Sequence, residues 1–584
     1  MKIDKRIPRL RFFSELYERA RSAQAPLEEK FAEHQAQYRG DDRIDGSTER
    51  AGAVRNITYE IIETEVSCEL PVPKVSARHY SEERERLAKS IERLCASLRS
   101  ALLFEELNDI DERYTYVLGG SVWLVEWDDS LRECSARGGV RVSCLSPRDF
   151  FPQPKIYSIE DMEYCFLRFD TTRSELCRRY GVSEEVAALA ESETATGEDD
   201  ETVTVVVCYY RGEDEQVCRY VFSGDAELED AVGYYRRRDE SGGYLDYQEP
   251  KGVIRLSDGS VIAPETPVLL GERVLGVQTR LPYYLPREFP IVIRRNTSAD
   301  RRLFGQSDCE YLRPQQQQIN KVESRIMQKL MRAAVTPIVP EDAVISVSNS
   351  IFGQVIRLRP GESAAQYGKV DTTPDISQDV LEAERLYDQA KRIVGISDTY
   401  AGMDTNLGNM SGYARQLQVS QAAGRLESKR RMKNAAYAAI DRLIFLHYLA
   451  FADEVRELSY RDAWGRMQNL TFNRYDFYRK NESDGSYEID DAYLFTPEIG
   501  LTSEGRRETV WEKNLENFRQ GALGDPSDPH TLCLYWQLQE RAHYPYAEDQ
   551  AEYFRRRLKE RKETIEQKEN QDITKEPSPL RDGA

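Results

Sequence analysis

Three pairs of adjacent carboxylates are the residues of this chain best suited to chemistry. Asp128–Asp129, Asp199–Asp200 and Asp490–Asp491 each offer two acidic side chains in sequence, the kind of ligand with which a two-metal nuclease holds its ions. Adjacent acids in turns are far more often solvated. The ten cysteines form no C-x-x-C or Cys/His zinc spacing, and the five histidines are isolated. We therefore predict no metal site, no cofactor and no catalytic residue.

Nucleotide-driven and hydrolytic enzymes leave recognisable motifs, and these are missing. No G-x-x-x-x-G-K-[ST] loop occurs, and the glycine pair in GGSVW, residues 119–123, has no lysine after it to hold a phosphate. Neither G-x-S-x-G nor H-E-x-x-H is present. The sequence thus predicts a protein that is not an enzyme, with a DNA-processing enzyme as the weaker alternative.

A stripe of basic side chains could contact phosphates. It runs at nearly helical spacing along a predicted helix, residues 307–334, and consists of Lys321, Arg325, Lys329 and Arg332. Three interpretations stay open. The stripe could be a solvated or intersubunit face that pairs with acids such as Glu382 and Glu384 on the next predicted helix. It could instead line a DNA channel, or it could contact a partner protein.

The composition restricts how DNA could be handled. At 584 residues the chain is too long for one core, so we expect two or more domains, and 31% charged with 40% hydrophobic residues is typical of a globular protein. The formal net charge is −20, from 101 acidic and 81 basic side chains. Proteins that grip DNA through its phosphates show the opposite balance. We infer that DNA, if it is a partner, is not bound tightly through its phosphates.

Localisation follows from what the chain lacks. Scattered cysteines are typical of free thiols in a reducing compartment. The start MKIDKRIPRLRFFSELYERA has no apolar core of a signal peptide. The most apolar long stretch, residues 435–452, contains Asp441, Arg442 and His447, which disfavours a membrane span. We expect an intracellular protein with no membrane contact.

The first half reads as an α+β region. Residues 1–50 predict a polar helical arm, and residues 81–104 a helix with one apolar stripe. From Tyr114 to Ser223 the alternation predicts strands, interrupted by a helical patch. A hairpin is expected to turn at Asp258–Gly259.

The second half is dominated by helices. Ser307 and Glu310 predict a capping box at the start of helix 307–334, and Pro314 either kinks that helix or begins its regular part. A strand-rich insert follows, with strands expected at Ala343–Val347 and Gln354–Leu358.

A return helix, residues 378–394, comes next. It is expected to bury Val380, Leu381, Leu386, Tyr387, Ala390 and Val394. After a glycine-rich loop, residues 413–452 predict one helix about 60 Å long at ~1.5 Å per residue. Three further helices are expected at 502–521, 529–542 and 545–567.

Five stretches, in this order, resemble portal proteins, the head-to-tail connectors of tailed double-stranded DNA bacteriophages and prophages. The most specific is FGQSDCEYLRPQQQQINKVESRIMQK, residues 304–329, which resembles the start of the family's first stem helix. The others are residues 54–75, 111–129, 146–166 and 528–545. The likeness covers roughly residues 50 to 560.

This resemblance implies an α+β portal architecture with an α/β wing, a helical stem, a small α/β clip, a long internal helix and a helical crown. The implied boundaries are an N-terminal arm 1–50, wing 51–305, first stem helix 306–334, clip 335–375, second stem helix 376–396, tunnel loop 397–412, long helix and remaining wing 413–500, crown 501–567 and disordered tail 568–584. In the tunnel loop, the resemblance singles out Gly402, Met403, Asp404, Asn406, Leu407, Gly408 and Met410.

The implied function is structural. Portal proteins form rings, usually of twelve subunits, at one capsid vertex of the virion, through which DNA is packaged and ejected. The implied partners are further copies of the chain, double-stranded DNA, the terminase large subunit, capsid and scaffolding proteins, and head-tail adaptor proteins, with assembly in the host cytoplasm. A neck adaptor or minor capsid protein is the alternative within the particle.

Overall fold

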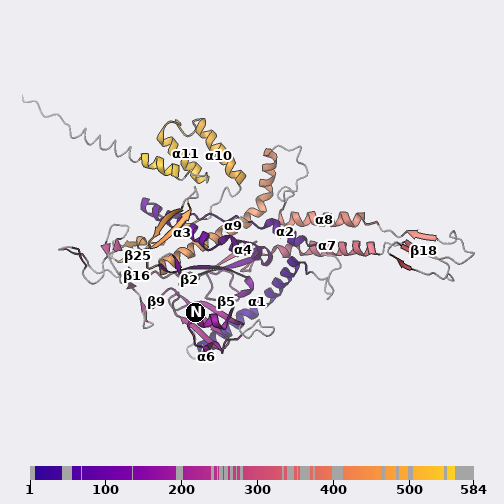
Figure 1. Ribbon diagram of the computed structural model, residues 1–584, viewed down its shortest axis with the longest axis horizontal. Coiled ribbons are helices and arrows are strands. Elements are labelled where there is room, and N and C mark those ends of the chain that lie inside the picture. The colour runs from indigo at the N-terminus through magenta and orange to yellow at the C-terminus, as the bar shows by residue number, and fades with distance from the viewer. Residues whose placement is uncertain are drawn as a thin grey trace, which may run out of the picture.

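The computed structural model describes most of residues 7–558. Its longest internal gaps are 42–54, 192–201, 339–347, 356–367, 397–411 and 497–503. Helices and strands are both abundant in the described part, so the α+β class is confirmed. Figure 1 shows strands of the first half of the chain below the long helix α9 (Gly412–Phe451). A helical hairpin projects from the molecule to the right.

The largest sheet is an antiparallel meander of five strands covered by α1 (Arg9–Arg39). Its central strand alternates between two cores: Val205 and Val207 face one, while Val206 and Cys208 face the other, where α1 packs with Phe13. Burial on both faces explains why this strand reads as a continuous run of β-branched residues. In order, the strands are β4 (Phe150–Pro152), β5 (Tyr164–Thr172), β6 (Thr202–Arg211), β7 (Val217–Ser223) and β8 (Ala226–Ala231).

A second, three-stranded sheet packs against α9. Its strands β17 (Ile291–Arg295), β2 (Gly120–Glu133) and β3 (Ala136–Leu145) are antiparallel, with Trp123 opposite Val292. The apolar stripe of α3 (Glu82–Ala101) joins the same core as α9, and Ser81 caps α3 by accepting from the amide of Arg84 at 3.1 Å. The second core therefore joins segments some 350 residues apart in sequence, as the Cys95 Sγ–Asp441 O contact illustrates.

The helical hairpin consists of α7 (Asp308–Met331) and α8 (Ser377–Val394). Its core is formed by Ile319, Val322, Leu386 and Ala390, together with α2 (Ile57–Glu65) at the base. Figure 1 shows α7 and α8 side by side, with β18 (Val335–Ile338) beyond their far ends, where it pairs with β21 (Gly368–Asp371). We call this element the α7–α8 hairpin.

The remaining elements are short. The helices are α4 (Phe104–Leu118), α5 (Arg173–Tyr180), α6 (Glu184–Ala187), α10 (Glu504–Arg519) and α11 (Pro529–Arg541). Two-stranded pairs are β1 (Val75–Ala77) with β26 (Tyr493–Phe495), β9 (Arg237–Arg238) with β10 (Tyr244–Leu245), β11 (Tyr247–Gln248) with β16 (Leu281–Pro282), β12 (Ile254–Arg255) with β13 (Val261–Ile262), β14 (Val268–Leu270) with β15 (Arg273–Leu275), β19 (Ser348–Ser350) with β20 (Gly353–Val355), β22 (Arg456–Arg461) with β23 (Met467–Phe472), and β24 (Tyr478–Lys480) with β25 (Tyr487–Ile489).

Some sequence-based predictions are corrected. Tyr114–Leu118 was expected to begin the strands but forms the end of α4, which Gly119 caps. Ser307 accepts from the amide of Cys309 at 3.0 Å, whereas Glu310 pairs with Arg302, so the reciprocal capping box does not form. The helix extends on both sides of Pro314, so its regular part does not begin there.

The predictions for the return helix and for two strand pairs are tested only in part by the described residues. Val380 and Leu381 are exposed on α8, because the hairpin core uses Ala383 and Leu386 instead. β20 begins one residue before the expected strand at Gln354, while Ala343–Val347 lies outside the described residues. The hairpin around Asp258–Gly259 is confirmed by the β12–β13 register, although its turn also lies outside them.

A backbone contact fixes where α7 begins. Gly119 has φ +88°, and a Cβ built on it would lie 2.5 Å from the carbonyl oxygen of Gly305. The side chain of Ser307 donates to the carbonyl oxygen of Val117 at 2.6 Å. The end of α4 and the segment leading into α7 thus lie against each other with no room for a side chain at Gly119.

Candidate functional site: a helical hairpin on a buried charged junction

The basic stripe lies on α7 and is paired with α8. Arg325 Nη1 is 3.6 Å and Lys329 Nζ is 2.5 Å from the carboxylate of Asp379. The predicted partner Glu382 instead binds Arg385 of its own helix at 2.7 Å. Lys321 is exposed on the same helix, and Arg332 lies outside the described residues. Arg325 also interacts electrostatically with Glu382, and Lys329 with Asp375, so acids of the α8 segment surround these two cations.

The same level of the hairpin exposes large apolar side chains. Lys329 and Asp379 are in contact, so Leu330 and Leu381 lie close to one height along the two antiparallel helices. Leu330 is 53% exposed and Leu381 is 64% exposed, and Met327 and Val380 are exposed too. A group of exposed apolar side chains on one element is typical of a surface that another molecule covers. We call these four residues the distal apolar group.

Charged side chains are buried where the hairpin meets α9. Lys429 of α9 donates to Glu65 of α2 at 3.0 Å and to Asp308, the first residue of α7, at 2.8 Å. Burial, reinforced by the Asp308 carboxylate, raises the pKa of Glu65 well above its usual range. Burial lowers the pKa of Lys429, but Asp308 and Glu65 outweigh it and raise that pKa above its ordinary value. The triad therefore keeps its lysine charged.

A second group continues the network one turn along α9. Lys433 lies 3.0 Å from Glu112 of α4, which also pairs with Arg294 of β17 at 2.8 Å. Arg294 additionally pairs with Asp111, which accepts from the indole Nε1 of Trp123 at 2.9 Å. Burial raises the pKa of Glu112, but Arg294 and Lys433 outweigh it, so that this pKa falls below its usual value.

Together these seven side chains form what we call the charged junction. Its members are Glu65, Asp111, Glu112, Arg294, Asp308, Lys429 and Lys433. It connects α2, α4, α7, α9 and β17, and every member is buried. Buried ion pairs of this kind fix one relative placement of the elements that carry them, since breaking one leaves an uncompensated charge. Its geometry suits mechanical connection of α9 to the hairpin.

Sequence reasoning did not find the charged junction. Lys429 and Lys433 stand at i and i+4 in a long helix, a spacing that is typical of a solvated face. Their acidic partners lie more than 100 residues away in the sequence, so no local pattern pairs them. Nothing in the sequence marks Lys429 as buried, because it stands beside Arg430 and Arg431 in a strongly charged stretch of the helix.

The remaining predicted site residues cannot be placed. Gly402, Met403, Asp404, Asn406, Leu407, Gly408 and Met410 all lie outside the described residues. Within the described part of the chain, no cluster of His, Cys, Asp and Glu side chains has the arrangement of a metal site. No described helix combines the length and apolar character that a membrane crossing requires.

The profile of the phage P22-like portal proteins matches residues 150–579, well over half of the chain. The protein belongs to the P22-like portal family. The matched portion of this portal protein includes the α7–α8 hairpin, α9 and four members of the charged junction, Arg294, Asp308, Lys429 and Lys433. A search of the curated proteins found no match. The portal family is structural.

Proposed function

We propose that this portal protein forms a ring of about twelve copies at one capsid vertex and serves as a conduit for viral DNA during packaging and ejection. The family match carries the proposal. The distal apolar group supports it, because four exposed apolar side chains on a projecting hairpin favour coverage by the next copy. Head-to-tail contacts that close by rotation generate a ring.

The charge of the chain supports a conduit. Each copy carries a formal charge of −20, so an assembled ring is strongly acidic overall. An acidic wall repels the phosphate backbone, and a few cations such as those of the basic stripe provide contacts without trapping the DNA. In this proposal Lys321, Arg325 and Lys329 face either the bore or the neighbouring hairpin.

Two further roles complete the proposal. The segment 335–375 at the tip of the hairpin docks the terminase large subunit and later the head-tail adaptor proteins, while other surfaces contact capsid and scaffolding proteins. The glycine-rich residues 398–412 form a tunnel loop, in which Met403, Leu407 and Met410 offer soft apolar contacts to DNA. The tip and the loop lie at the two ends of the segment that contains α8.

Ring formation is tested by negative-stain electron microscopy and mass photometry of the purified protein. We expect rings of roughly twelve subunits around a central hole. Leu381→Glu should abolish them while the circular dichroism spectrum stays unchanged, because a charge would then stand in the proposed contact. Gln378→Glu, an exposed polar residue of the same helix, is the matched control and should still form rings. Small closed oligomers without a hole would contradict the proposal.

DNA passage is tested separately, in a packaging assay with assembled rings. Lys321→Ala/Arg325→Ala should reduce DNA uptake with ring assembly intact if the stripe faces the bore. Deletion of residues 404–409 should impair packaging or genome retention. If assembly is normal and both variants package and retain DNA like the parent, the assignments of the stripe and of the loop are wrong, whereas the ring itself would stand.

A further inference from the structure

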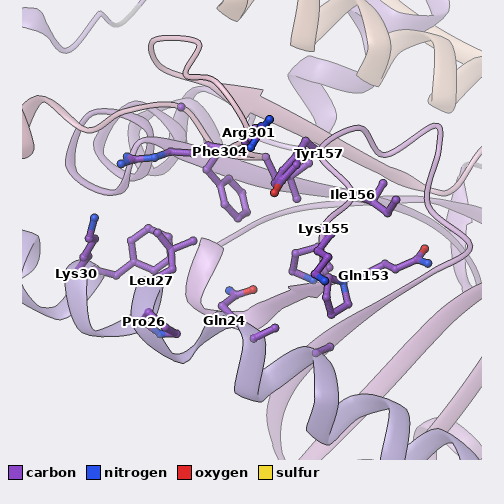
Figure 2. Close-up of a pocket in the computed structure, with 18 residues that line it drawn as sticks. Gln24, Pro26, Leu27, Lys30, Gln153, Lys155, Ile156, Tyr157, Arg301 and Phe304 are labelled. Atoms are coloured by element: carbon purple, nitrogen blue, oxygen red, sulfur yellow. The ribbon is translucent and has the colours of Figure 1, made fainter.

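An apolar pocket with a basic rim lies at the side of the molecule where α1 crosses the segment leading into α7. Its volume is about 470 Å³, a size that holds one or two large side chains or a small ligand. Figure 2 shows Leu27 of α1 and the ring of Phe304 facing the same space, with Lys30 on one side and Lys155 on the other. None of its lining residues belongs to the hairpin or to the charged junction.

The apolar wall is held rigidly. Phe304 and Phe31 are almost completely buried and belong to the main core, and Leu27 and Ile156 pack against that core. A pocket whose walls are fixed by the core loses little conformational entropy when it is filled. The pocket is therefore already shaped for a bulky apolar group.

The rim is cationic. Lys30, Lys155 and Arg301 line it, and none of the three forms an ion pair with any described residue, whereas Arg302 is neutralised by Glu310 at 3.0 Å. Lys155 has φ +66° and Arg301 has φ +51°, so two of the four non-glycine residues with left-handed backbone in the described chain lie on this rim. Such conformations cost free energy and are retained mainly where the surrounding structure demands them.

We propose that this pocket binds a partner protein through a short segment that has one bulky apolar side chain flanked by acidic residues. The apolar chamber would take the side chain, and Lys30, Lys155 and Arg301 would pair with the carboxylates. Charge complementarity is the argument. Three cations, none of which forms an ion pair with a described residue, line an apolar pocket on a chain whose net charge is −20. DNA is a poorer match, because phosphates gain nothing from an apolar chamber.

The test is selection from a random dodecapeptide library displayed on phage, with the full-length protein as target and the Lys30→Glu/Lys155→Glu variant for counter-selection. We expect enriched sequences with Trp, Phe or Leu next to two or more acids. The synthetic consensus peptide should bind the parent protein about tenfold or more tightly than the double variant, since two attractive pairs become repulsive. Ala23→Trp, which fills the pocket from α1, should also weaken binding.

Arg86→Glu, the reversal of an exposed cation on α3, is the matched control and should change the affinity less than about twofold. Enriched peptides without acidic excess, no enrichment at all, or equal affinity for the parent and the double variant would overturn the proposal. Mass photometry of Lys30→Glu/Lys155→Glu is the last arm. If this variant failed to form the oligomers that the parent forms, the proposal would also be overturned, because the pocket would then be a contact between copies of the chain.

Discussion

Lys429 of α9 lies 2.8 Å from the carboxylate of Asp308, the residue with which α7 begins. The pair joins the longest helix of the protein directly to the base of the α7–α8 hairpin. Asp308 is also well placed for the helix it starts, since a negative charge at a helix N-terminus interacts favourably with the helix dipole. One buried contact thus contributes both to the start of α7 and to its attachment.

Replacing this lysine tests the charged junction. Lys429→Met should lower the free energy of unfolding by about 3–5 kcal/mol, because it leaves the carboxylates of Glu65 and Asp308 buried without a counter-ion. Urea denaturation followed by circular dichroism measures the change. Glu65→Gln is the matched control and should cost much less, since Lys429 keeps Asp308 as its partner. Equal losses for the two variants would show that the lysine does not hold the junction.

The pH dependence of stability should report on a buried histidine. Burial lowers the pKa of His447 to about 4, and its Nδ1 is 2.8 Å from the carbonyl oxygen of Leu443. Because the folded-state pKa is depressed, the histidine's contribution is present above the unfolded value of about 6.5 and is lost as the pH falls towards 4. Between pH 7 and pH 5 the parent should lose about 2 kcal/mol of stability from this residue.

His447→Phe should remove that loss, because phenylalanine does not titrate and the site is lined by Tyr235 and Phe451. Urea midpoints at pH 7 and pH 5 are the measurement. His79→Gln, a substitution at an exposed histidine, should keep the parent's pH dependence. A parallel decline in the parent and His447→Phe would assign the acid sensitivity to other groups.

Asp379 should modulate the hairpin's charge rather than its stability. Arg325 and Lys329 are partly exposed, so the loss of both pairs in Asp379→Asn should cost about 1 kcal/mol or less. The variant releases two cations on one face, and its affinity for double-stranded DNA at low salt should increase, with a steeper salt dependence. Fluorescence anisotropy of labelled DNA measures both. Asp388→Asn, on the same helix, should have a smaller effect, and equal effects would indicate non-specific charge.

The contact between Gly119 and Gly305 predicts a sharp steric limit. Gly119→Ala should destabilise the protein by about 2–4 kcal/mol, since it combines the cost of a left-handed backbone with overlap against a carbonyl oxygen. Gly181→Ala is the control: its φ is +65°, but nothing lies within 4 Å of the added Cβ, so only the backbone cost of about 1 kcal/mol applies. The unfolding temperatures of the two variants are the measurement. Similar decreases would mean that the end of α4 moves to accommodate the added methyl group.

Periodicity predicted the elements whose burial is regular. The long helix was expected at 413–452 and is found at Gly412–Phe451, and strand β6 was recognised because both of its faces are buried. Tyr114–Leu118 was misassigned because aromatic and β-branched residues favour strands locally, whereas packing of this segment against α1 and β2 decides for a helix. On α8 the secondary structure was predicted correctly but the burial was not. Leu381 was expected in the core because it is apolar, and it is exposed.

The candidate site was only partly accessible from the sequence. Spacing placed Lys321, Arg325 and Lys329 on one helix, yet Asp379 could not be preferred over Glu382 or Glu384 without the packing of α7 on α8. The charged junction and the basic-rimmed pocket depend on contacts between segments far apart in the chain. Their side chains are of types normally found in water, so burial is a tertiary property that no local pattern encodes.

The charged junction lies near the middle of α9 and divides the helix into two halves. Lys429 is about 26 Å from Gly412 at ~1.5 Å per residue, and beyond Lys429 the helix packs in the two cores as far as Phe451. A bend of about five degrees at the junction would carry the Gly412 end about 2 Å and leave the half beyond Lys429 in place. The end of α9 that adjoins the glycine-rich loop is thus where a small displacement of the base of α7 would be most amplified.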